Sequence, residues 1–411
     1  MKILAIETSC DDTGIAILSA RGGSASGGEA DFCVLSNIVA SQIKVHQKYG
    51  GVYPAMAKRE HQKNLVPVLI KALKESNLLK TDLSGNFTNV KKSDISKILE
   101  REPELEKKLT PFLKKYEKPD IDLIAITNGP GLEPCLWVGV NFAKALSYFW
   151  DIPIVPVNHI ESHILVNYLD LPAQAGNKNI KLPAIALVVS GGHTQIILMK
   201  KIGEYEVLGE TRDDAAGECF DKAAKILGLG YPGGPIIAKL ADRDPISIIN
   251  RDRVSIQLPR PMINSKDYDF SFSGLKTAIF YVWKKIKLTS NFSDRSTREL
   301  IQIQMAKEIQ QAIIDVLLKK TLKAAKDYKA KSIILGGGVS ANQELRKQFA
   351  WYCESQRSNL NLIFPELNLS TDNGLMTAIT GFYHRRQKIT PSASLGRFLR
   401  KIEADGNLRI K

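Results

Sequence analysis

Two histidines in the stretch Pro156–His163, which reads PVNHIESH, have the spacing of a metal site. His159 and His163 stand four residues apart, about one helical turn, so on a helix both imidazoles project from the same face. Two neutral imidazoles and one carboxylate from elsewhere would form a three-ligand face with open positions for a transition metal. Such a pair also arises by chance, but the chain has only six histidines and another follows at Ser190-Gly191-Gly192-His193. The stretch is therefore a candidate metal centre that needs a third ligand.

The best candidate for the missing carboxylate lies near the carboxyl end of the chain. Asp372 belongs to the polar stretch Ser370–Gly374, which precedes a segment that has the apolar spacing of a helix. An N-cap role alone would explain an aspartate just before a helix. It can also reach the two histidines and complete the ligand set. The residues alone leave both interpretations open.

Four turns that are rich in glycine or polar residues follow apolar strand patterns. In each of them, backbone N–H groups or short polar side chains could approach an anion or a nucleotide. An ordinary turn also explains each of them when it is taken alone, and Asn342 can be a helix cap. The turns are Glu7–Gly14 with Asp11 and Asp12 at its tip, Asn128–Leu132, Ser190–Thr194, and Gly336–Asn342 with three successive glycines.

Two of these turns belong to repeated hairpins, and the repeat predicts the fold. Apolar runs at Ile3–Ile6 and Ile15–Leu18 flank the first turn, and Ala184–Val189 with a return strand at 196–198 repeats this plan. Such a duplication is typical of the two-lobed α/β fold of actin-like proteins, sugar kinases and Hsp70-type ATPases. In that fold both lobes are ribonuclease H-like, and a nucleotide lies in the cleft between them.

The chain is long enough for two such lobes, because 411 residues exceed one ordinary core. We expect an N-terminal actin-like lobe over residues 1–155, with a charged helical insertion at 76–119. A C-terminal actin-like lobe should cover residues 156–411 and contain a helical insertion at about 204–330. The last helix, from about residue 372, should pack back toward the N-terminal lobe.

The composition indicates a globular protein that has a basic surface. The formal net charge of +14 suits a polyanionic partner, and nucleic acid is the first candidate. The five cysteines are scattered without a C-x-x-C pair, which argues against a disulfide framework and against a zinc ribbon. We expect a cytoplasmic protein, because the sequence has no apolar run of membrane-spanning length and no signal-peptide pattern.

Ten motifs occur in one order along the chain, and together they go beyond generic nucleotide binding. They are ETSCDDTGIAI, GGVYPAMAKREH, TNGPGLEPCLWVG, VNHIESH, VSGGHT, DDAAGECFDK, YPGG, FSFSGLK, GGGVSAN and STDN. In this order they resemble TsaD, the bacterial and organellar branch of the universal Kae-type family of tRNA threonylcarbamoyladenosine enzymes. The resemblance covers essentially the whole chain outside residues 76–119. The chain departs from the usual family pattern at Ala55 and at Pro134-Cys135.

The resemblance implies a reaction and assigns residues to it. The chain would transfer the threonylcarbamoyl group of threonylcarbamoyl-AMP to N6 of adenosine 37 in tRNAs reading codons that begin with A. His159, His163 and Asp372 would bind the metal, and Asp11 would be the acidic residue that the transfer requires. The residues implied to bind the adenylate are Val188, Val189, Ser190, Gly191, Gly192, Asp221, Gly234 and Asn342.

The same resemblance implies a cofactor and partners. One divalent metal would be bound per subunit; a face of two histidines and one carboxylate favours Fe(II), and Zn(II) is the second candidate. The implied substrates are tRNA and threonylcarbamoyl-AMP. A TsaB-like paralogue and a TsaE-like ATPase are the implied partner proteins, and no membrane is implied.

Three other functions remain as alternatives. An actin-like small-molecule kinase or ATPase would fit the duplicated lobes but would not explain the paired histidines. A zinc peptidase of the H-E-x-x-H type needs a glutamate directly after the first histidine, where this chain has Ile160 and places Glu161 one residue later. A non-catalytic partner subunit would not need the complete ligand set.

Overall fold

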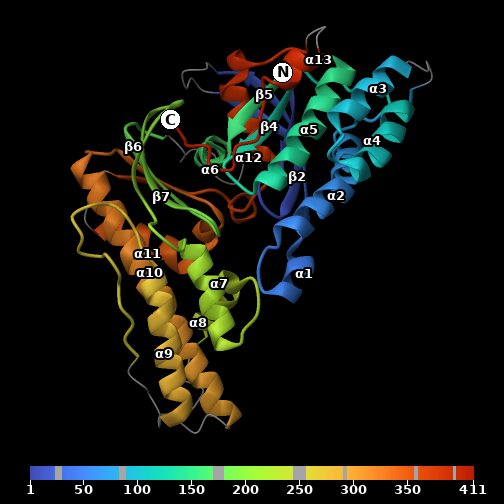
Figure 1. Cartoon of the computed structure of the whole chain (residues 1–411). Helices are drawn as coiled ribbons and strands as arrows, with labels where there is room; N and C mark the ends of the chain where they lie inside the picture. The colour runs from blue at the N-terminus through green and yellow to red at the C-terminus, as the bar shows by residue number, and fades with distance from the viewer. Residues whose placement is uncertain are drawn as a thin grey trace.

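Two five-stranded mixed sheets, each flanked by helices, form the two lobes of the computed structural model (Figure 1). The structure describes residues 1–23, 30–82, 89–169, 180–243, 256–289, 294–355, 360–391 and 395–411. Residues 83–88 of the expected insertion at 76–119 lie outside the described residues. The same holds for residues 244–255 and 290–293 of the expected insertion at about 204–330.

The first sheet has the strand order β3-β2-β1-β4-β5. β1 pairs antiparallel with β2 and β2 antiparallel with β3, whereas β4 runs parallel to β1 and β5 parallel to β4. Its strands are β1 (Lys2–Glu7), β2 (Asp12–Gly22), β3 (Ala30–Ser41), β4 (Leu123–Gly129) and β5 (Ile154–Asn158). The apolar runs of the first predicted hairpin are therefore β1 and β2, and Asp12 begins β2.

The second sheet repeats this plan with the order β10-β9-β6-β7-β8. β6 pairs antiparallel with β7 and β7 antiparallel with β8, whereas β9 runs parallel to β6 and β10 parallel to β9. The strands are β6 (Ala184–Val189), β7 (Thr194–Lys201), β8 (Glu204–Glu210), β9 (Ser332–Gly336) and β10 (Asn361–Ile363). Equivalent strands share order and direction, so the predicted two-lobed fold with duplicated ribonuclease H-like sheets is confirmed.

The core is layered because the central strands are apolar on both faces. β1 and β6 lie in the middle of their sheets, and both read as nearly continuous apolar runs, as strands buried on two sides do. The inner faces of the two sheets share one core with helices α6 (His159–Leu165) and α12 (Gly374–Tyr383), which lie between them. The site described below lies at the N-terminal ends of these two helices.

The outer face of the first sheet is covered by helices that include those of the charged segment at 76–119. Its core joins β1 and β2 to residues of α2, α3, α4 and α5, among them Ile95 and Leu109. The charged segment is therefore not exposed on all sides, because one face of its helices is buried and completes this core. The helices are α2 (Pro54–Glu75), α3 (Asn89–Ile98), α4 (Pro103–Lys115) and α5 (Glu133–Trp150), whereas the short helix α1 (Ile43–His46) precedes them and contributes no residue to this core.

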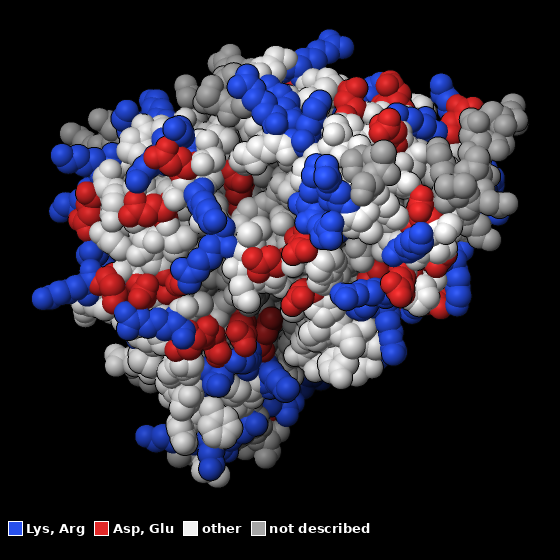
Figure 2. Space-filling view, turned by 45° about the horizontal axis from the view of Figure 1, so that its top comes forward, with Lys and Arg blue, Asp and Glu red and all other residues white. Residues whose placement is uncertain are grey.

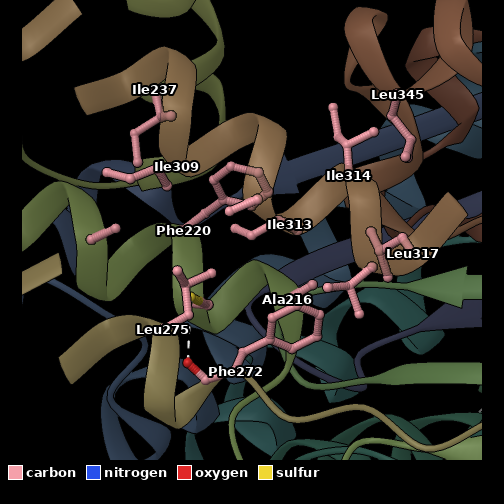
Figure 3. Close-up of a cluster of buried hydrophobic side chains, with 14 of the residues drawn as sticks. Ala216, Phe220, Ile237, Phe272, Leu275, Ile309, Ile313, Ile314, Leu317 and Leu345 are labelled. Carbon is pink, nitrogen blue, oxygen red and sulfur yellow. Dashed lines mark hydrogen bonds between the residues drawn. The ribbon is translucent and has the colours of Figure 1, made fainter. Parts of the chain in front are cut away.

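The outer face of the second sheet packs against a separate group of helices, and Figure 3 shows part of this core. There Phe220 lies near Ile309 and Ile313, while Phe272 and Leu275 lie on the other side of the cluster. The helices are α7 (Ala216–Leu227), α8 (Gly233–Ala241), α9 (Ser273–Thr289), α10 (Arg295–Asp327) and α11 (Gln343–Ser355). Among the described residues, no helix is both long enough and apolar enough to span a membrane.

Two expected boundaries need correction. The expected division between residues 155 and 156 falls inside β5, which belongs to the first sheet because it pairs with β4. The expected helical insertion from about residue 204 begins with a strand, since Glu204–Glu210 is β8 at the edge of the second sheet. An edge strand with one exposed face carries charged residues, so its sequence lacks the apolar run by which other strands were predicted.

The C-terminal part of the chain returns to the first lobe. α12 packs on β1 and β2, and it is followed by α13 (Leu395–Leu399), so the helix after residue 372 is not the last one. Phe398 and Ile402 are buried in the outer core of the first lobe, and Ile410 is buried in the core between the sheets. Arg409 forms an ion pair with Glu210 of β8 over 3.2 Å. The last residues therefore connect the two lobes.

Candidate metal centre and interlobe cavity

The two histidines lie on the short helix α6, whose start is fixed by a cap. The Asn158 side chain accepts hydrogen bonds from the backbone N–H groups of Ile160 and Glu161 at 2.8 and 3.1 Å. The helix is buried throughout, and the ring centroids of His159 and His163 lie 4.7 Å apart. The predicted placement of both imidazoles on one helical face therefore holds.

Asp372 lies opposite these histidines, and its neighbour caps α12. The Asn373 side chain accepts from the backbone N–H groups of Leu375 and Met376 at 3.0 and 3.1 Å, so Asp372 is not the cap. The Asp372 Oδ1 atom lies 3.1 Å from His163 Nε2 and 3.7 Å from His159 Nε2. Ligand atoms that share one tetrahedral ion lie about 3.3 Å apart, given bonds of about 2.0–2.2 Å.

The three side chains fit a bound cation by their arrangement and their polarity. One ligand atom from each lies within 4.8 Å of the others. His163 is 1% exposed, and in the described part of the chain neither ring nitrogen makes a hydrogen bond of good geometry. A buried donor or acceptor without a partner is costly, and a metal ion would satisfy the nitrogen that faces Asp372.

The electrostatics of the cluster are those of paired acid and base groups. Burial by itself lowers the pKa of His159, but the carboxylates of Asp372 and Glu7 outweigh it and hold that pKa above its ordinary value. Burial likewise raises the pKa of Asp372, yet the neighbouring imidazoles of His159 and His163 bring it below its ordinary value. Asp372 is therefore ionised and ready to bind a cation at neutral pH.

A second carboxylate, which no sequence motif indicated as a site residue, lies behind His159. Glu7 is fully buried at the end of β1, and its Oε2 lies 3.5 Å from His159 Nδ1, on the side of the ring away from Asp372. Glu7 accepts hydrogen bonds from the Thr127 hydroxyl at 2.5 Å and the Ser9 backbone N–H at 2.6 Å. The Ser9 hydroxyl lies 3.1 Å from the same ring nitrogen. This arrangement orients the imidazole and directs Nε2 toward Asp372.

A cavity of about 1650 Å³ opens between the lobes above this cluster. Its size exceeds that of an ordinary small-molecule pocket, which measures about 300–1,000 Å³. Most of the residues predicted as site residues line it together, although they come from both lobes and from distant parts of the chain. Those that line it are Asp11, His159, Ser190, Gly191, Gly192, Asp221, Gly234, Asn342 and Asp372.

Three predicted residues do not line the cavity. Val188 and Val189 are 0% and 1% exposed, and their side chains pack into the cores on the two faces of the second sheet. The pleat of β6 directs these side chains into the two cores and away from the cavity, so the expected contact with the adenylate stays a prediction that concerns their backbone atoms. His163 lies below the cavity surface, beside Asp372.

Asp11, at the end of the turn that joins β1 to β2, and Asp12, the first residue of β2, both line the cavity. Burial, and then the negative charge of Asp372, raise the pKa of Asp11. Burial and the adjacent Asp11 raise the pKa of Asp12 to about 7. The turn is held by His61 of α2, whose Nδ1 lies 2.8 Å from the Thr13 hydroxyl and whose Nε2 lies 2.9 Å from the Cys10 carbonyl oxygen. The carboxylates therefore sit on a fixed backbone.

The opposite wall carries Asp221 and Asn342. Asp221 accepts a hydrogen bond from the Gly233 backbone N–H at 2.6 Å, and burial raises its pKa. Asn342 accepts from the Leu345 backbone N–H at 3.0 Å and donates to Gln310 Oε1 at 2.8 Å. The cap interpretation of Asn342 is thus correct, and the same side chain also faces the cavity.

Glu161 points away from the cavity, which bears on the peptidase alternative. Its Oε2 lies 2.8 Å from His384 Nε2, and Glu161 is 5% exposed and does not line the cavity. A zinc peptidase needs its glutamate beside the metal-bound water. Glu161 instead links α6 to the end of α12.

The family model and the curated relatives agree on one family. A family model described as TsaD, tRNA N6-adenosine threonylcarbamoyltransferase, matches residues 33–85 and 112–379. A curated tRNA N6-adenosine threonylcarbamoyltransferase of Thermosipho africanus is 40% identical over 410 residues, covering 100% of both chains. The protein of the same name from Syntrophomonas wolfei is 40% identical, covering 93% of this chain and 92% of the relative. That from Bacillus cereus is 39% identical, with 92% and 90% coverage.

Among solved structures, full-length HypF in a phosphate- and nucleotide-bound form aligns with a TM-score of 0.48 and 10% sequence identity. The alignment covers 92% of this chain, which spans 46% of the HypF chain.

Proposed function

This chain belongs to the tRNA N6-adenosine threonylcarbamoyltransferase family, and from that premise we propose its donor, acceptor atom and cofactor. The family makes the chain an acyltransferase that acts on tRNA. We propose that it transfers the threonylcarbamoyl group of threonylcarbamoyl-AMP to N6 of adenosine 37, in tRNAs reading codons that begin with A. The observation that carries this proposal is the cluster of His159, His163 and Asp372 beside a large interlobe cavity.

The proposed reaction suits a site that supplies position and charge. Threonylcarbamoyl-AMP is a mixed anhydride, so its carbonyl carbon is already activated and AMP is a good leaving group. The N6 atom attacks this carbon, the new C–N bond forms, and the bond from carbon to the phosphate oxygen breaks. The attacking amine is weak, so the site must position it and stabilise the oxyanion that develops.

Asp11 is the proposed acceptor of the proton that N6 loses. Its carboxyl lies in the cavity wall, and its raised pKa makes it a better base than an ordinary carboxylate. The backbone that carries it is fixed by His61 through the Cys10 carbonyl. This assignment places the base in the first lobe and leaves the second lobe to bind the donor.

The metal is proposed to be bound by His159 Nε2, His163 Nε2 and Asp372 Oδ1. Fe(II) suits two imidazoles and one carboxylate, and Zn(II) is the second candidate. When bound, such an ion acts as a Lewis acid that polarises a carbonyl or phosphoryl oxygen of the donor. Glu7 and Ser9 keep the His159 ring in the orientation that binding needs.

The AMP part of the donor is proposed to lie along the second lobe. Gly191 and Gly192 offer their backbone N–H groups, and both glycines are exposed in the cavity wall. Asp221, Gly234 and Asn342 are proposed to contact the adenosine part. Asp221 accepts a hydrogen bond from the Gly233 backbone N–H and lines the cavity, where its carboxylate is proposed to accept from a ribose hydroxyl.

The partners and location of the protein follow from the same proposal. The acceptor is tRNA, and a net charge of +14 would favour binding to it. We propose that a TsaB-like paralogue and a TsaE-like ATPase act with the chain in the cytoplasm. Adding these two proteins to the transfer assay tests whether they are required.

The decisive experiment supplies synthetic threonylcarbamoyl-AMP and an appropriate tRNA transcript, followed by nucleoside digestion and mass spectrometry. Wild-type protein should yield N6-threonylcarbamoyladenosine at position 37. His159→Ala and Asp372→Ala should each abolish the product and lower the metal content measured by inductively coupled plasma mass spectrometry. Full activity in both variants would refute the metal mechanism, and metal-independent phosphorylation of small molecules by ATP would favour the kinase alternative.

A further inference from the structure

A basic groove lies between α7 and α9 in the second lobe, outside the metal cluster. Its volume is about 520 Å³. In the described part of the chain, no aspartate or glutamate lines it. We call it the lysine groove, and it is lined by Lys222, Lys225 and Ile226 of α7 and by Lys276, Phe280, Trp283, Lys284 and Lys287 of α9. In Figure 2 basic side chains gather at the lower end of the molecule, where α9 lies in Figure 1.

The spacing of the α9 residues arranges charge and an aromatic ring in one row. Lys276, Phe280 and Lys284 follow one another at intervals of four residues, so they lie on one helical face at a rise of about 6 Å each. α9 contains no acidic residue between Ser273 and Thr289. The row therefore presents positive charge that no carboxylate of the same helix neutralises.

The two aromatic residues of the lysine groove have different exposures. Trp283 is 4% exposed and forms part of the buried core, with the Lys287 Nζ 5.3 Å from its ring centroid. Phe280 is 49% exposed and lines the groove. Phe280 thus offers an aromatic face to a ligand, whereas Trp283 supports the floor.

The lysine groove adjoins the interlobe cavity at α7. Lys222 and Lys225 line both, so α7 forms the wall that the groove and the cavity share. Lys222 is already bound to Asp214 at 2.7 Å and to Glu218 at 2.9 Å, which fixes it at this rim. A nucleic acid strand that runs along α9 and then over Lys225 would reach the rim of the cavity.

We propose that the lysine groove binds the single-stranded segment of the tRNA anticodon loop beside the adenosine that enters the cavity. This inference rests on the proposed function and adds the surface that holds the acceptor. Lysines in a row neutralise successive phosphates, and an exposed aromatic ring stacks on an unpaired base whatever its identity. An acidic peptide would form the same charge contacts with the lysines, but it would gain less binding energy from the ring of Phe280 because it has no base to stack on it.

The first test removes charge from the groove and measures tRNA affinity. Lys284→Gln/Lys287→Gln should weaken binding of a full tRNA transcript, as followed by fluorescence anisotropy. The slope of log affinity against log salt should become shallower by about 1.4, at about 0.7 for each lost contact with a single strand. The control is Lys71→Gln/Lys74→Gln on α2, which removes two exposed lysines at the same spacing from the other lobe. It should leave the slope unchanged.

The second test removes the stacking face. Phe280→Ala should weaken tRNA binding about tenfold, and Phe280→Trp should restore it. Tyr281→Ala is the matched control, because Tyr281 is 64% exposed, adjacent in sequence and absent from the groove lining. Thermal melting of all variants should agree with wild type, which separates a binding effect from unfolding.

The outcomes distinguish this inference from the proposed function. If wild-type protein forms the modified nucleoside but the groove variants keep wild-type tRNA affinity and salt slope, the groove is not the tRNA surface. If wild-type protein never forms the nucleoside, the proposed function itself fails. Loss of binding to a poly-glutamate peptide, with tRNA binding intact, would overturn the inference in favour of an acidic protein partner.

Discussion

The turns that join β1 to β2 and β6 to β7 occupy equivalent places in the two lobes, yet they differ in chemistry. The first carries Asp11 and buried Ser9, and contacts from Glu7 and His61 hold it in place. The second is Ser190–His193, whose two glycines are exposed. A Cβ atom added at Gly191 or Gly192 would meet no other atom within 4 Å. One turn thus supplies charge, and the other supplies space.

This difference shows how a duplicated hairpin can serve two roles in one site. The backbone order is shared, so both turns face the same cavity. The space beside Gly191 and Gly192 is not needed for packing within the chain, because a Cβ atom at either position would meet no neighbouring atom. We therefore expect the first turn to affect the rate of transfer and the second to affect binding of the donor.

The largest expected effect is that of Asp11→Asn in the first turn. Removing a base from the reaction should lower kcat by about 100- to 10,000-fold, while KM for the donor changes little. Steady-state kinetics with synthetic threonylcarbamoyl-AMP measures both constants. Metal content should remain that of wild type, because Asp11 is not among the clustered ligands. A raised KM with unchanged kcat would contradict the division between the turns.

Glu7→Gln should have the next largest effect, acting through His159. The amide keeps the size of the carboxylate but removes the charge beside His159 Nδ1, so metal affinity should fall about 10- to 100-fold. Competition with a chromogenic chelator measures this affinity. Supplying excess metal should restore most of the activity, whereas it should not rescue Asp372→Ala. Equal metal affinity in Glu7→Gln and wild type would show that Glu7 does not support metal binding.

Gly191→Ala should have a smaller effect, confined to donor binding. The added methyl group would occupy space proposed for the adenylate, and KM for the donor should rise about tenfold at unchanged melting temperature. The matched control is Gly217→Ala on α7, where a Cβ would lie 2.5 Å from the Ser190 carbonyl oxygen. That variant should lower the melting temperature, since it forces the same turn to move. A wild-type KM in Gly191→Ala would show that the space is not used.

The smallest expected effect is a loss of folding stability in mild acid, caused by His61, which holds the first turn. Burial lowers the pKa of His61 from 6.5 to about 4. Between these values the unfolded chain binds a proton that the folded chain does not, so the stability contributed above pH 6.5 is lost as pH falls toward 4. Between pH 7 and pH 5.5 the loss should be about 1 kcal/mol. Urea unfolding measures it, and His61→Gln should show a correspondingly weaker pH dependence over this interval.

The fold and the clustering of His159 with His163 could be predicted from the sequence, because there the local pattern alone determines the arrangement. Apolar runs on either side of polar turns predict the two hairpins. The four-residue spacing of His159 and His163 predicts that they lie together, because both belong to one helix. Asp372 and Asn373 are both good caps by type, so the sequence could not say which one would be free. The structure assigns the cap to Asn373.

Other features could not be read from the sequence because their cause lies far along the chain. Glu7 ends an apolar strand and looks like an ordinary turn residue, whereas its burial depends on Thr127 and Thr377 from distant elements. Val188 and Val189 adjoin Ser190 in sequence, yet the strand places them in two different cores. A carboxylate that closes an apolar run, as Glu7 does, is the one local sign of its position, but by itself it does not distinguish a buried carboxylate from a turn residue.

The return of the C-terminal segment to the first lobe has a consequence for synthesis on the ribosome. The first sheet emerges early, but α12, Phe398 and Ile402 complete its cores only after the rest of the chain has been made. The second sheet, in contrast, has all its strands once residue 363 has emerged. The usual order, in which the N-terminal unit folds first, is therefore reversed at its last step. The lobe that is translated first is the last to be finished.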